Sequence, residues 1–510
     1  MDELMELISR MKWEEAKEKA TALLAQGENS DTFWILNGTI YEAAGDLFTC
    51  YSCIMHGLAV NPDNYELYFM LGNYYRESNQ KQAMISYRYA LQLCTDETDR
   101  SVINEQITSL DCAIPATTVI TYRRSDTIEQ INRKIKQAPA DDNILLVQEH
   151  VIYNQQILFW LELGLYDNEN CACVSPLSNS IENNQYLHPE TKDPASYLAY
   201  NLHEFDPLTH LPEEKVWLSS AIQLIRRTAL DVTGLPDQKL ACIQDALIDL
   251  GLRFARQKFS QRVLHNVCVY QTDCTSNPFS TSQELREKWG CSIHYYANVR
   301  MDLICYIREE KDAPIHVLEV GCGCGSTLSH IRHLFPNART YGIELMEFPA
   351  SLGTHMGEIH CMNVETVDQF PFPLASLDYV IFGDLLEHLR EPDTLIKKLY
   401  PYLRPHGRIL SSIPNLMNAS VITKLLQGDF TYKDAGLLDQ THIHFFTYNE
   451  IVRMFTSCGY DLVKCDGKIG YEDYSEKDQK LMEQILTLSG IADHQLFQIY
   501  QFLVVAQKPV

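Results

Sequence analysis

The most informative segment of the chain reads Ile315-His-Val-Leu-Glu-Val-Gly-Cys-Gly-Cys-Gly-Ser-Thr-Leu328. Its first half is a short β-branched run, typical of a strand buried on both faces of a parallel sheet. Three glycines at alternate positions follow, and a helix is expected to open at Ser326. Glycines in such a turn let a ligand approach the backbone beside the N-terminal amides of the next helix. The stretch predicts a strand–turn–helix unit that binds a small molecule.

The same strand–turn–helix order repeats from about residue 290 to the end of the chain. This alternation indicates an α/β fold with a doubly wound parallel sheet. Further strands are expected at residues 340–344, just before Asn363, at 377–382 and up to Ser412, with closing strands at 460–464 and 501–506.

A glycine-rich turn alone does not identify the ligand, because dinucleotide enzymes use G-x-G-x-x-G. Here Gly325 comes one position earlier than that spacing, and Glu319 stands two residues before Gly321. The string E-x-G-x-G-x-G resembles the first motif of class I S-adenosylmethionine-dependent methyltransferases. The later strands also resemble that family in their order, including its terminal antiparallel hairpin. The resemblance implies a Rossmann-like methyltransferase domain at residues 281–510.

The resemblance also implies that S-adenosyl-L-methionine is the cofactor. Glu344 ends the second strand, 19 residues after Gly325, where a carboxylate can accept both ribose hydroxyls. Asn363 stands where the family contacts adenine, and residues 295–300 resemble the helix that covers the cofactor. The expected cofactor-binding residues are Glu319, Gly321, Gly323, Gly325, Glu344, Asn363 and Asp384.

Methyl transfer from a sulfonium needs aligned reactants and, for a hydroxyl acceptor, a group that takes the proton. Imidazole has a pKa near neutrality and suits that task. His388 and His442 are the expected catalytic bases, whereas His444 precedes two phenylalanines and is expected to be structural. The sequence lacks Asn/Asp-Pro-Pro-Tyr/Phe after the fourth strand, which argues against methylation of amino groups on bases or glutamine.

Residues 1–112 are expected to form pairs of helices. Two segments, 31–62 and 65–94, align at a period of about 34 residues, with Gly38 on Gly72 and Trp34 on Tyr68. Small residues let helices approach and aromatic residues fill the groove between them. The period and pattern resemble tetratricopeptide repeats, which dock proteins or neighbouring domains. An ordinary helical bundle is the alternative.

Residues 113–280 mix strands and helices, and their order resembles a GT-A glycosyltransferase. Strands are expected at 143–147 and 171–175, a helix at 157–165, and a polar loop at 178–185. Where that family places metal-binding acids, this chain has Gln148, Glu149 and His150. Since Mg²⁺ and Mn²⁺ prefer carboxylate oxygens, we expect a degenerate domain without transferase activity. An unrelated α/β spacer is the alternative.

Composition excludes several classes of protein. The 510 residues carry 42 Lys and Arg against 67 Asp and Glu, a net charge of −25, which argues against a nucleic-acid substrate. No apolar run is long enough to span a membrane. The 16 cysteines are spread along apolar segments, and Cys50-x-x-Cys53 lacks a second pair, so we predict reduced thiols, no metal site and a cytoplasmic protein.

Together these features predict S-adenosylmethionine-dependent O-methylation of a small or carbohydrate-like acceptor. The glycan expectation, in bacterial surface-glycan synthesis, rests on the fusion to a glycosyltransferase-like region. Three alternatives stay open: a quinone, lipid or protein acceptor, a non-catalytic scaffold, and an active bifunctional enzyme.

Overall fold

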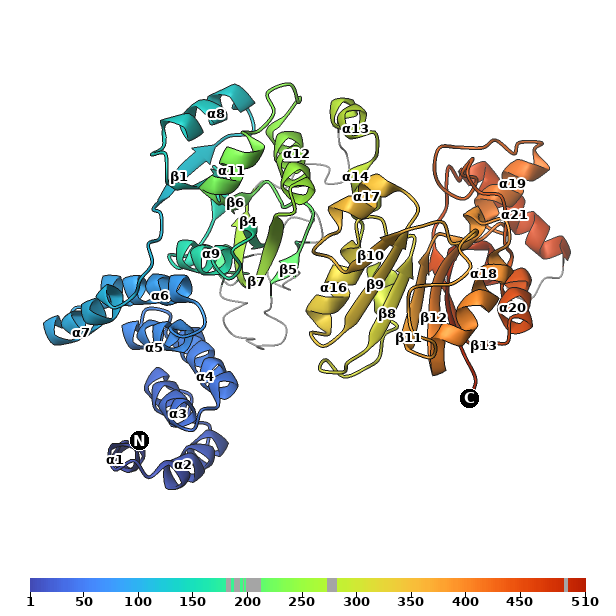
Figure 1. Ribbon diagram of the computed structural model, residues 1–510. Coiled ribbons are helices and arrows are strands. Elements are labelled where there is room, and N and C mark those ends of the chain that lie inside the picture. The colour runs from blue at the N-terminus through green and yellow to red at the C-terminus, as the bar shows by residue number, and fades with distance from the viewer. Residues whose placement is uncertain (180–184, 188–192, 196, 199–211, 273–281, 490–493) are drawn as a thin grey trace. The chain divides into compact units, whose positions relative to one another are not determined.

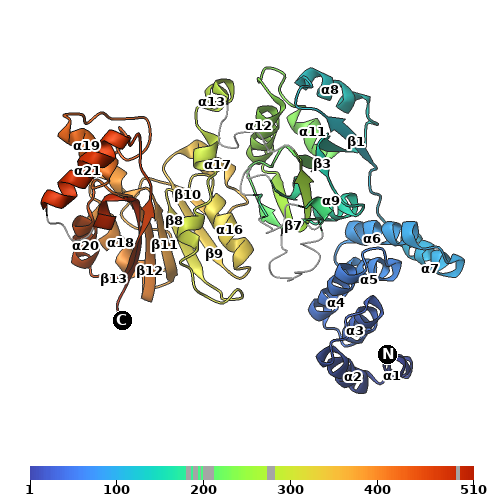
Figure 2. The same ribbon diagram turned by 180° about the vertical axis from the view of Figure 1, so that it is seen from behind.

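A computed structural model describes residues 1–179, 185–187, 193–195, 197–198, 212–272, 282–489 and 494–510. The chain divides into two compact units, Met1–His294 and Tyr295–Val510 (Figures 1 and 2). The boundary predicted between residues 280 and 281 lies outside the described residues. The three-domain division therefore stays a prediction.

The first unit begins with helices that pack as consecutive neighbours (Figure 1). They are α1 (Asp2–Ser9), α2 (Trp13–Ala25), α3 (Asp31–Ala43), α4 (Leu47–Val60), α5 (Tyr65–Tyr75), α6 (Gln80–Leu93) and α7 (Glu97–Thr108).

Small residues sit where these helices approach most closely. A Cβ at Gly38 would collide with Met70 and one at Gly57 with Leu67, and Gly72 leaves room for the ring of Tyr87. Trp34 and Tyr68, which align in the sequence, are both buried. The predicted helix pairs are confirmed, whereas their identity as tetratricopeptide repeats stays a prediction.

A mixed sheet follows in the same unit, with strand order β1-β2-β6-β4-β7-β3 and β5 paired to β7. The strands are β1 (Thr117–Tyr122), β2 (Asn143–Gln148), β3 (Val151–Ile152), β4 (Cys171–Ser178), β5 (Glu213–Glu214), β6 (Ile222–Ile225) and β7 (Ser260–Gln271). The helices are α8 (Ile128–Gln137), α9 (Ile157–Leu165), α11 (Arg227–Thr233), α12 (Ile243–Arg256) and α13 (Gln283–Trp289). The strands and the helix predicted at residues 143–175 are confirmed.

The helices and this sheet share one hydrophobic cluster. Helix α9 packs on α6, and the ring of Phe159 lies 4.9 Å from that of Tyr68 in an edge-on contact. Gln82 on α6 donates to the carbonyl of Leu163 on α9 at 3.0 Å. The first unit therefore has a continuous core from α4 to β7.

The interpretation of residues 113–280 as a degenerate glycosyltransferase-like domain stays a prediction. Gln148 ends β2 and is buried, while Glu149 accepts two hydrogen bonds from Arg123 at 2.7 and 2.8 Å. The one carboxylate at this strand end is thus engaged in an ion pair. Residues 180–184 of the predicted polar loop lie outside the described residues.

The second unit is built on a seven-stranded sheet of order β10-β9-β8-β11-β12-β14-β13. Its strands are β8 (His316–Val320), β9 (Arg339–Glu344), β10 (Glu358–Cys361), β11 (Leu377–Gly383), β12 (Leu403–Pro414), β13 (Asp461–Ile469) and β14 (Ile499–Gln507). The strands from β10 to β12 are parallel, and β14 runs antiparallel between β12 and β13. The predicted doubly wound sheet and closing antiparallel strands are confirmed.

Helices cover both faces of this sheet (Figure 1). They are α15 (Met301–Ile304), α16 (Ser326–Leu334), α17 (Glu347–Leu352), α18 (Pro392–Leu399), α19 (Ala419–Leu426), α20 (Tyr448–Ser457) and α21 (Glu476–Ser489), and α14 (Ile293–Tyr296) spans the division between the units.

Two separate hydrophobic clusters pack against the central strands of this unit. Val317 on β8 packs with α15 and α16, whereas its neighbour Leu318 packs with α18 and α20. Successive side chains of a strand point to opposite faces of the sheet, so both faces of the central strands are buried. This burial explains the continuous apolar run before the glycine turn.

None of the helices among the described residues combines the length and apolar character needed to span a bilayer. The cysteines in the described residues are free thiols.

Candidate functional site

The glycine turn lies at the point where the strand order reverses. Strands β9 and β10 continue the sheet on one side of β8, and β11 and β12 continue it on the other. Ligands of open α/β sheets bind at the carboxyl ends of the strands at such a switch point. The turn after β8 and the loop after β11 meet there, since a Cβ at Gly321 would lie 3.3 Å from the Leu385 side chain.

All three glycines of the turn adopt the left-handed region, with φ of 75° at Gly321, 54° at Gly323 and 77° at Gly325. The amide of Gly321 donates to Ile343 at 2.8 Å, which ties the turn to β9. At Gly323 a side chain would also collide with the carbonyl oxygen of Tyr296, which accepts from the amide of Cys324 at 2.8 Å. Backbone conformation and close packing both require glycine here.

Glu344 ends β9 and its carboxylate fixes the turn. Its Oε2 accepts from the amide of Gly323 at 2.8 Å, and its Oε1 accepts from the amide of Met346 at 2.9 Å. Each carboxylate oxygen keeps a further lone pair. The Glu344 carboxylate, which is predicted to bind the ribose, is therefore held in place by two backbone donors beside the glycines.

Glu319 lies beneath the turn and is 4% exposed. Burial raises the pKa of its carboxyl to about 8, against the lowering effects of a hydrogen bond from Thr327 and the charge of Arg300. Its Oε2 has no hydrogen-bond partner. This buried carboxyl can receive a donor or a positive charge from a ligand at the turn.

Asp384 follows β11 with φ of 53°, a strained conformation for a residue other than glycine. Three side-chain donors hold its carboxylate: Arg300 at 2.9 Å, Ser412 at 2.7 Å, and the Nε2 of Gln501. Arg300 also contacts both oxygens of Asp302, at 3.0 and 3.1 Å.

Sequence reasoning missed Arg300, Ser412 and Gln501 as partners of Asp384. They lie 84, 28 and 117 residues from it along the chain. No local pattern connects positions so far apart. The pairing of β11, β12 and β14 brings Ser412 and Gln501 to Asp384, and Arg300 reaches it from the segment just before α15.

Asn363 follows β10 at the same edge of the sheet. Its side-chain oxygen accepts from the amide of Glu365 at 2.9 Å, and its carbonyl accepts from the amides of Thr366 and Val367. The oxygen expected to contact adenine thus also shapes the turn after β10.

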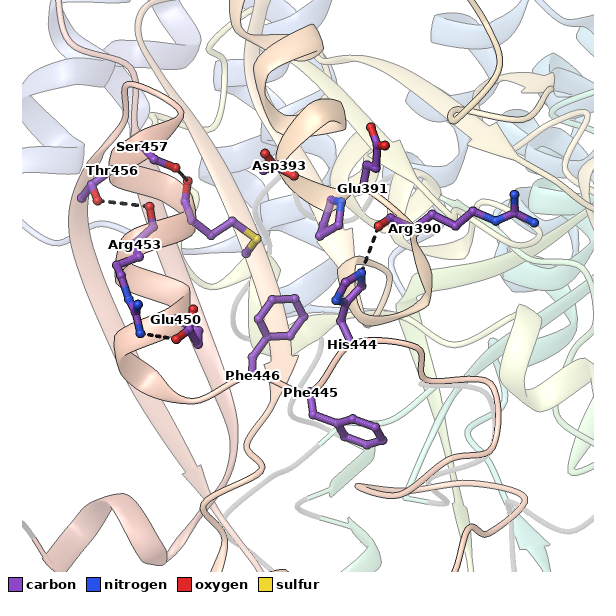
Figure 3. A pocket seen from close by; sticks show the side chains of 12 residues that line it. Arg390, Glu391, Asp393, His444, Phe445, Phe446, Glu450, Arg453, Thr456 and Ser457 are labelled. Carbon is purple, nitrogen blue, oxygen red and sulfur yellow. Dashed lines mark hydrogen bonds and ion pairs between the residues drawn. The ribbon is translucent and has the colours of Figure 1, made fainter.

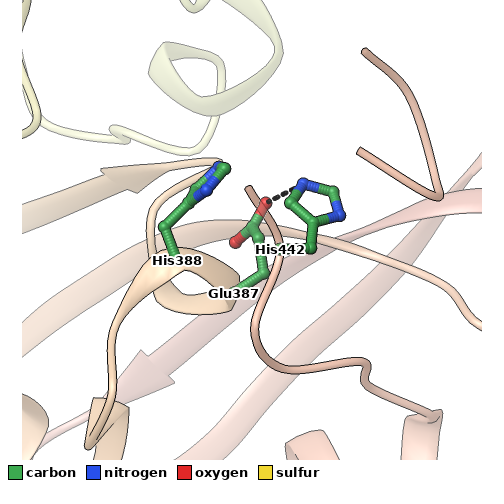
Figure 4. Close-up of side chains that lie close together, drawn as sticks. All are labelled: Glu387, His388 and His442. Carbon is green, nitrogen blue, oxygen red and sulfur yellow. Dashed lines mark ion pairs between the residues drawn. The ribbon is translucent and has the colours of Figure 1, made fainter. Parts of the chain in front are cut away.

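The two predicted bases lie together, with Glu387 between them (Figure 4). Glu387 and His388 belong to the 3₁₀ turn η2 (Leu386–His388), and His442 comes from the loop before α20. The Glu387 carbonyl accepts from the amides of Ile443 and His444, each at 3.0 Å, which binds the loop to η2. Sequence reasoning missed Glu387, since a Glu before His also suits a helix start.

Burial shapes the acid–base properties of this group. Burial, followed by the Asp384 charge, raises the pKa of Glu387 well above its ordinary value. Burial, followed by repulsion from His388, lowers the pKa of His442. The imidazole of His442 is therefore neutral at physiological pH.

A separate surface pocket of about 780 Å³ lies between the start of α18 and α20 (Figure 3). His444 lines it and contacts the carbonyl of Arg390 at 3.0 Å, consistent with the structural role expected of it. None of the predicted cofactor-binding residues lines this pocket. It is not the site at the switch point.

Comparison with known proteins identifies the second unit. Residues 293–464 match the family model described as a methyltransferase domain. The chain carries a methyltransferase domain. The cofactor of this domain is S-adenosylmethionine, as predicted.

Two curated relatives of the methyltransferase domain come from bacteria. The malonyl-[acyl-carrier protein] O-methyltransferase of Bacillus cytotoxicus is 29% identical over 132 residues, which are 24% of this chain and 45% of the relative. The ubiquinone biosynthesis O-methyltransferase of Idiomarina loihiensis is 25% identical over 161 residues, 30% of this chain and 64% of the relative. The chain thus spans between about half and two thirds of the length of these two relatives.

Among solved structures, an S-adenosylmethionine-dependent methyltransferase from Archaeoglobus fulgidus is 20% identical. The similarity covers 44% of this chain and 98% of that one, with a TM-score of 0.31.

The residues of the switch point fit this cofactor. The side-chain-free glycine turn leaves room for close approach to the backbone, and Glu344 keeps acceptor capacity for ribose hydroxyls. The cofactor carries an ammonium and a sulfonium, and the orphaned Oε2 of Glu319 lies beneath the turn where a positive charge can be compensated.

Proposed function

We propose that the chain is an enzyme that transfers a methyl group from S-adenosylmethionine to a hydroxyl oxygen of a small acceptor. The observation that carries the proposal is the joint position of the glycine turn, Asp384 and two imidazoles at one switch point. The names of the two relatives, both O-methyltransferases, support oxygen as the methylated atom.

In this proposal each residue has a distinct task. Gly321, Gly323 and Gly325 admit the cofactor to the backbone, Glu344 accepts from its ribose, and Asn363 contacts adenine. Glu319 lies toward the methionine end, and Asp384, held by Arg300 and Ser412, faces the cofactor from the opposite loop.

When bound, the cofactor supplies a methyl group activated by a positively charged sulfur. The chain aligns the acceptor with that methyl group, excludes water and lowers the barrier to loss of the hydroxyl proton. His388 and His442 are the residues nearest to that task, because both lie on loops at the carboxyl end of the sheet.

The acceptor class we favour is carbohydrate-like, as in surface-glycan synthesis. Support comes from the sequence of residues 113–280, whose predicted order of strands and helices resembles a GT-A glycosyltransferase. A second candidate is a carrier-bound acyl or quinone-type acceptor, which the names of the relatives favour. The helical pairs of residues 1–112 are proposed to dock a protein partner.

Calorimetric titration of the full chain with S-adenosylmethionine and S-adenosylhomocysteine is the first test. We expect both to bind, and we expect release of S-adenosylhomocysteine when sugar, nucleotide-sugar, acyl-carrier or phenolic acceptors are added in turn. Product mass then identifies the acceptor. Absence of binding to either ligand would overturn the enzymatic proposal and leave a scaffold.

A further inference from the structure

The group formed by Glu387, His388 and His442 contains a buried carboxylate that the protein leaves without hydrogen bonds. Glu387 is 1% exposed, and neither of its carboxylate oxygens has a hydrogen-bond partner. The imidazole of His442 lies close by, with its Nε2 4.0 Å from Oε1 of Glu387. Ionisation of a desolvated carboxyl without donors is costly, so a positively charged ligand there would stabilise its charged form.

Both imidazoles are oriented to offer a lone pair. The Nδ1 of His442 lies 3.3 Å from the carbonyl of Leu437, and the Nδ1 of His388 lies 3.1 Å from the carbonyl of Thr441. A carbonyl can only accept, so each Nδ1 carries the proton and each Nε2 keeps its lone pair. Metal-binding histidines commonly donate a hydrogen bond from their second ring nitrogen in this way.

The three side chains converge on one place. One ligand atom from each residue lies within 4.8 Å of the others (Figure 4). Bonds of about 2.0–2.1 Å to one ion hold such atoms roughly 3–3.5 Å apart, so side-chain rotations that bring them about 1 Å closer would complete the site. The backbone bonds from Ile443 and His444 to Glu387 already hold the two segments in place.

We propose that Glu387, His388 and His442 bind one divalent transition-metal ion, of the class of Zn²⁺, Co²⁺, Mn²⁺ or Fe²⁺. Two imidazoles and one carboxylate suit these ions, whereas Mg²⁺ and Ca²⁺ prefer oxygen ligands throughout. Asp384 is not a ligand, because Arg300, Ser412 and Gln501 engage its carboxylate. This inference differs from the absence of a metal site that the sequence predicts.

The proposed ion binds the acceptor hydroxyl, and this role rests on the proposed function. Three protein ligands leave at least one position open. His388 is half-buried, whereas Glu387 and His442 are buried. Coordination lowers the pKa of the hydroxyl, whose proton leaves to water. The oxygen lone pair then forms the bond to the methyl carbon as the carbon–sulfur bond breaks, and the sulfonium becomes a neutral thioether. His388 and His442 therefore act as ligands rather than as the predicted bases.

Titration of chelator-treated, full-length protein with Co²⁺ tests the site through visible absorption, which reports nitrogen and oxygen coordination. We expect one ion per chain. Glu387→Gln, His388→Asn and His442→Asn should each weaken binding by at least about 100-fold. The matched control is His444→Asn, since His444 lies in the same loop but bonds to Arg390, and it should bind as the wild type does. Coordination by the cysteines would appear as a thiolate charge-transfer band and would count against the site.

Thermal unfolding with and without Zn²⁺ keeps the test valid if a variant is less stable. The ion should raise the Tm of the wild type and of His444→Asn, and leave the Tm of Glu387→Gln unchanged. Equal stabilisation of Glu387→Gln, or no stoichiometric binding to the wild type, would overturn the proposal. S-adenosylmethionine binding is measured on the same samples, so intact cofactor binding without ion binding refutes the ion site alone.

Discussion

At the scale of single residues, the cofactor site depends on backbone conformations that few side chains tolerate. The glycines of the turn and Asp384 all have positive φ, and Asp384 keeps its conformation through Arg300, Ser412 and Gln501. Strain of this kind persists only where the surroundings impose it, and it is common at functional sites.

Gly323→Ala should abolish cofactor binding, because the new methyl group meets the carbonyl oxygen of Tyr296. Gly428→Ala is the matched control, since Gly428 has φ of 84° and nothing within 4 Å of a Cβ. The control should lose only about 1 kcal/mol of stability, the cost of a left-handed alanine. Calorimetry and thermal unfolding measure both effects, and equal cofactor affinity in the two variants would contradict the close-approach argument.

Glu319 predicts a dependence of stability on pH. Burial raises the pKa of its carboxyl from 4.5 to about 8, with Arg300 and Glu344 as the neighbouring charges. The folded state thus holds a proton that the unfolded chain loses near pH 4.5, so the free energy of unfolding falls as pH rises from about 4.5 to 8.

Glu319→Gln removes that contribution. The variant should gain stability relative to the wild type between pH 5 and pH 8, as measured by chemical denaturation across this range. A difference between the two proteins that does not change with pH would refute the assignment.

At the scale of elements, α13 is attached to α12 by one buried carboxylate. Asp249 on α12 is fully buried and accepts from Trp289 at 3.0 Å, Lys288 at 2.6 Å and Arg253 at 2.9 Å. Two of these donors belong to α13, so this helix packs within the first unit although it follows the boundary predicted from the sequence.

Asp249→Asn should weaken this attachment and cost about 2–3 kcal/mol, because buried donors lose a charged acceptor. Hydrogen exchange should increase at residues 283–290. The ion pair of the exposed Asp231 with Arg227, at 3.4 Å, provides the control, and Asp231→Asn should change stability by less than about 0.5 kcal/mol. Unchanged exchange in α13 would show that other contacts hold it.

At the scale of the whole molecule, the second unit contains every strand of its own sheet. A fragment of residues 295–510 should therefore unfold cooperatively and bind S-adenosylmethionine as the full chain does. A fragment of 311–510 lacks Tyr296 and Arg300, which support the glycine turn and Asp384, and it should not bind. Calorimetry measures the affinity of each fragment for S-adenosylmethionine. Equal affinity of the two fragments would contradict the supporting role assigned to residues 295–310.

The first unit should behave differently when it is divided. Tyr68 and Phe159 belong to one cluster that joins the helices to the mixed sheet. A fragment of residues 1–112 exposes that face, and its helices should melt at a lower temperature than those of residues 1–294. Circular dichroism at increasing temperature provides the measurement, and equal melting temperatures would indicate that the helices form an independent domain.

Much of the second unit follows from local sequence. The apolar run of residues 315–320, the glycines after it and the helical spacing from Ser326 determine a strand, a turn and a helix, since each rests on the period of burial or on allowed φ. Glu344 and Asn363 are found in the same way, because Glu344 ends a strand and Asn363 stands two residues after one. The carboxyl ends of parallel strands share one edge, so sequence order alone places these residues together.

The partners of those residues depend on contacts between distant parts of the chain. Arg300 and Gln501 reach Asp384 from opposite ends of the unit, and His442 reaches Glu387 across 55 residues of chain, through a loop bonded to η2. Such contacts depend on how strands and loops stack in space, and sequence spacing does not encode them. Local periodicity and glycine conformation are enough to specify the sheet and the cofactor turn, whereas long-range packing sets which charges are paired and which buried carboxyl is left for a ligand.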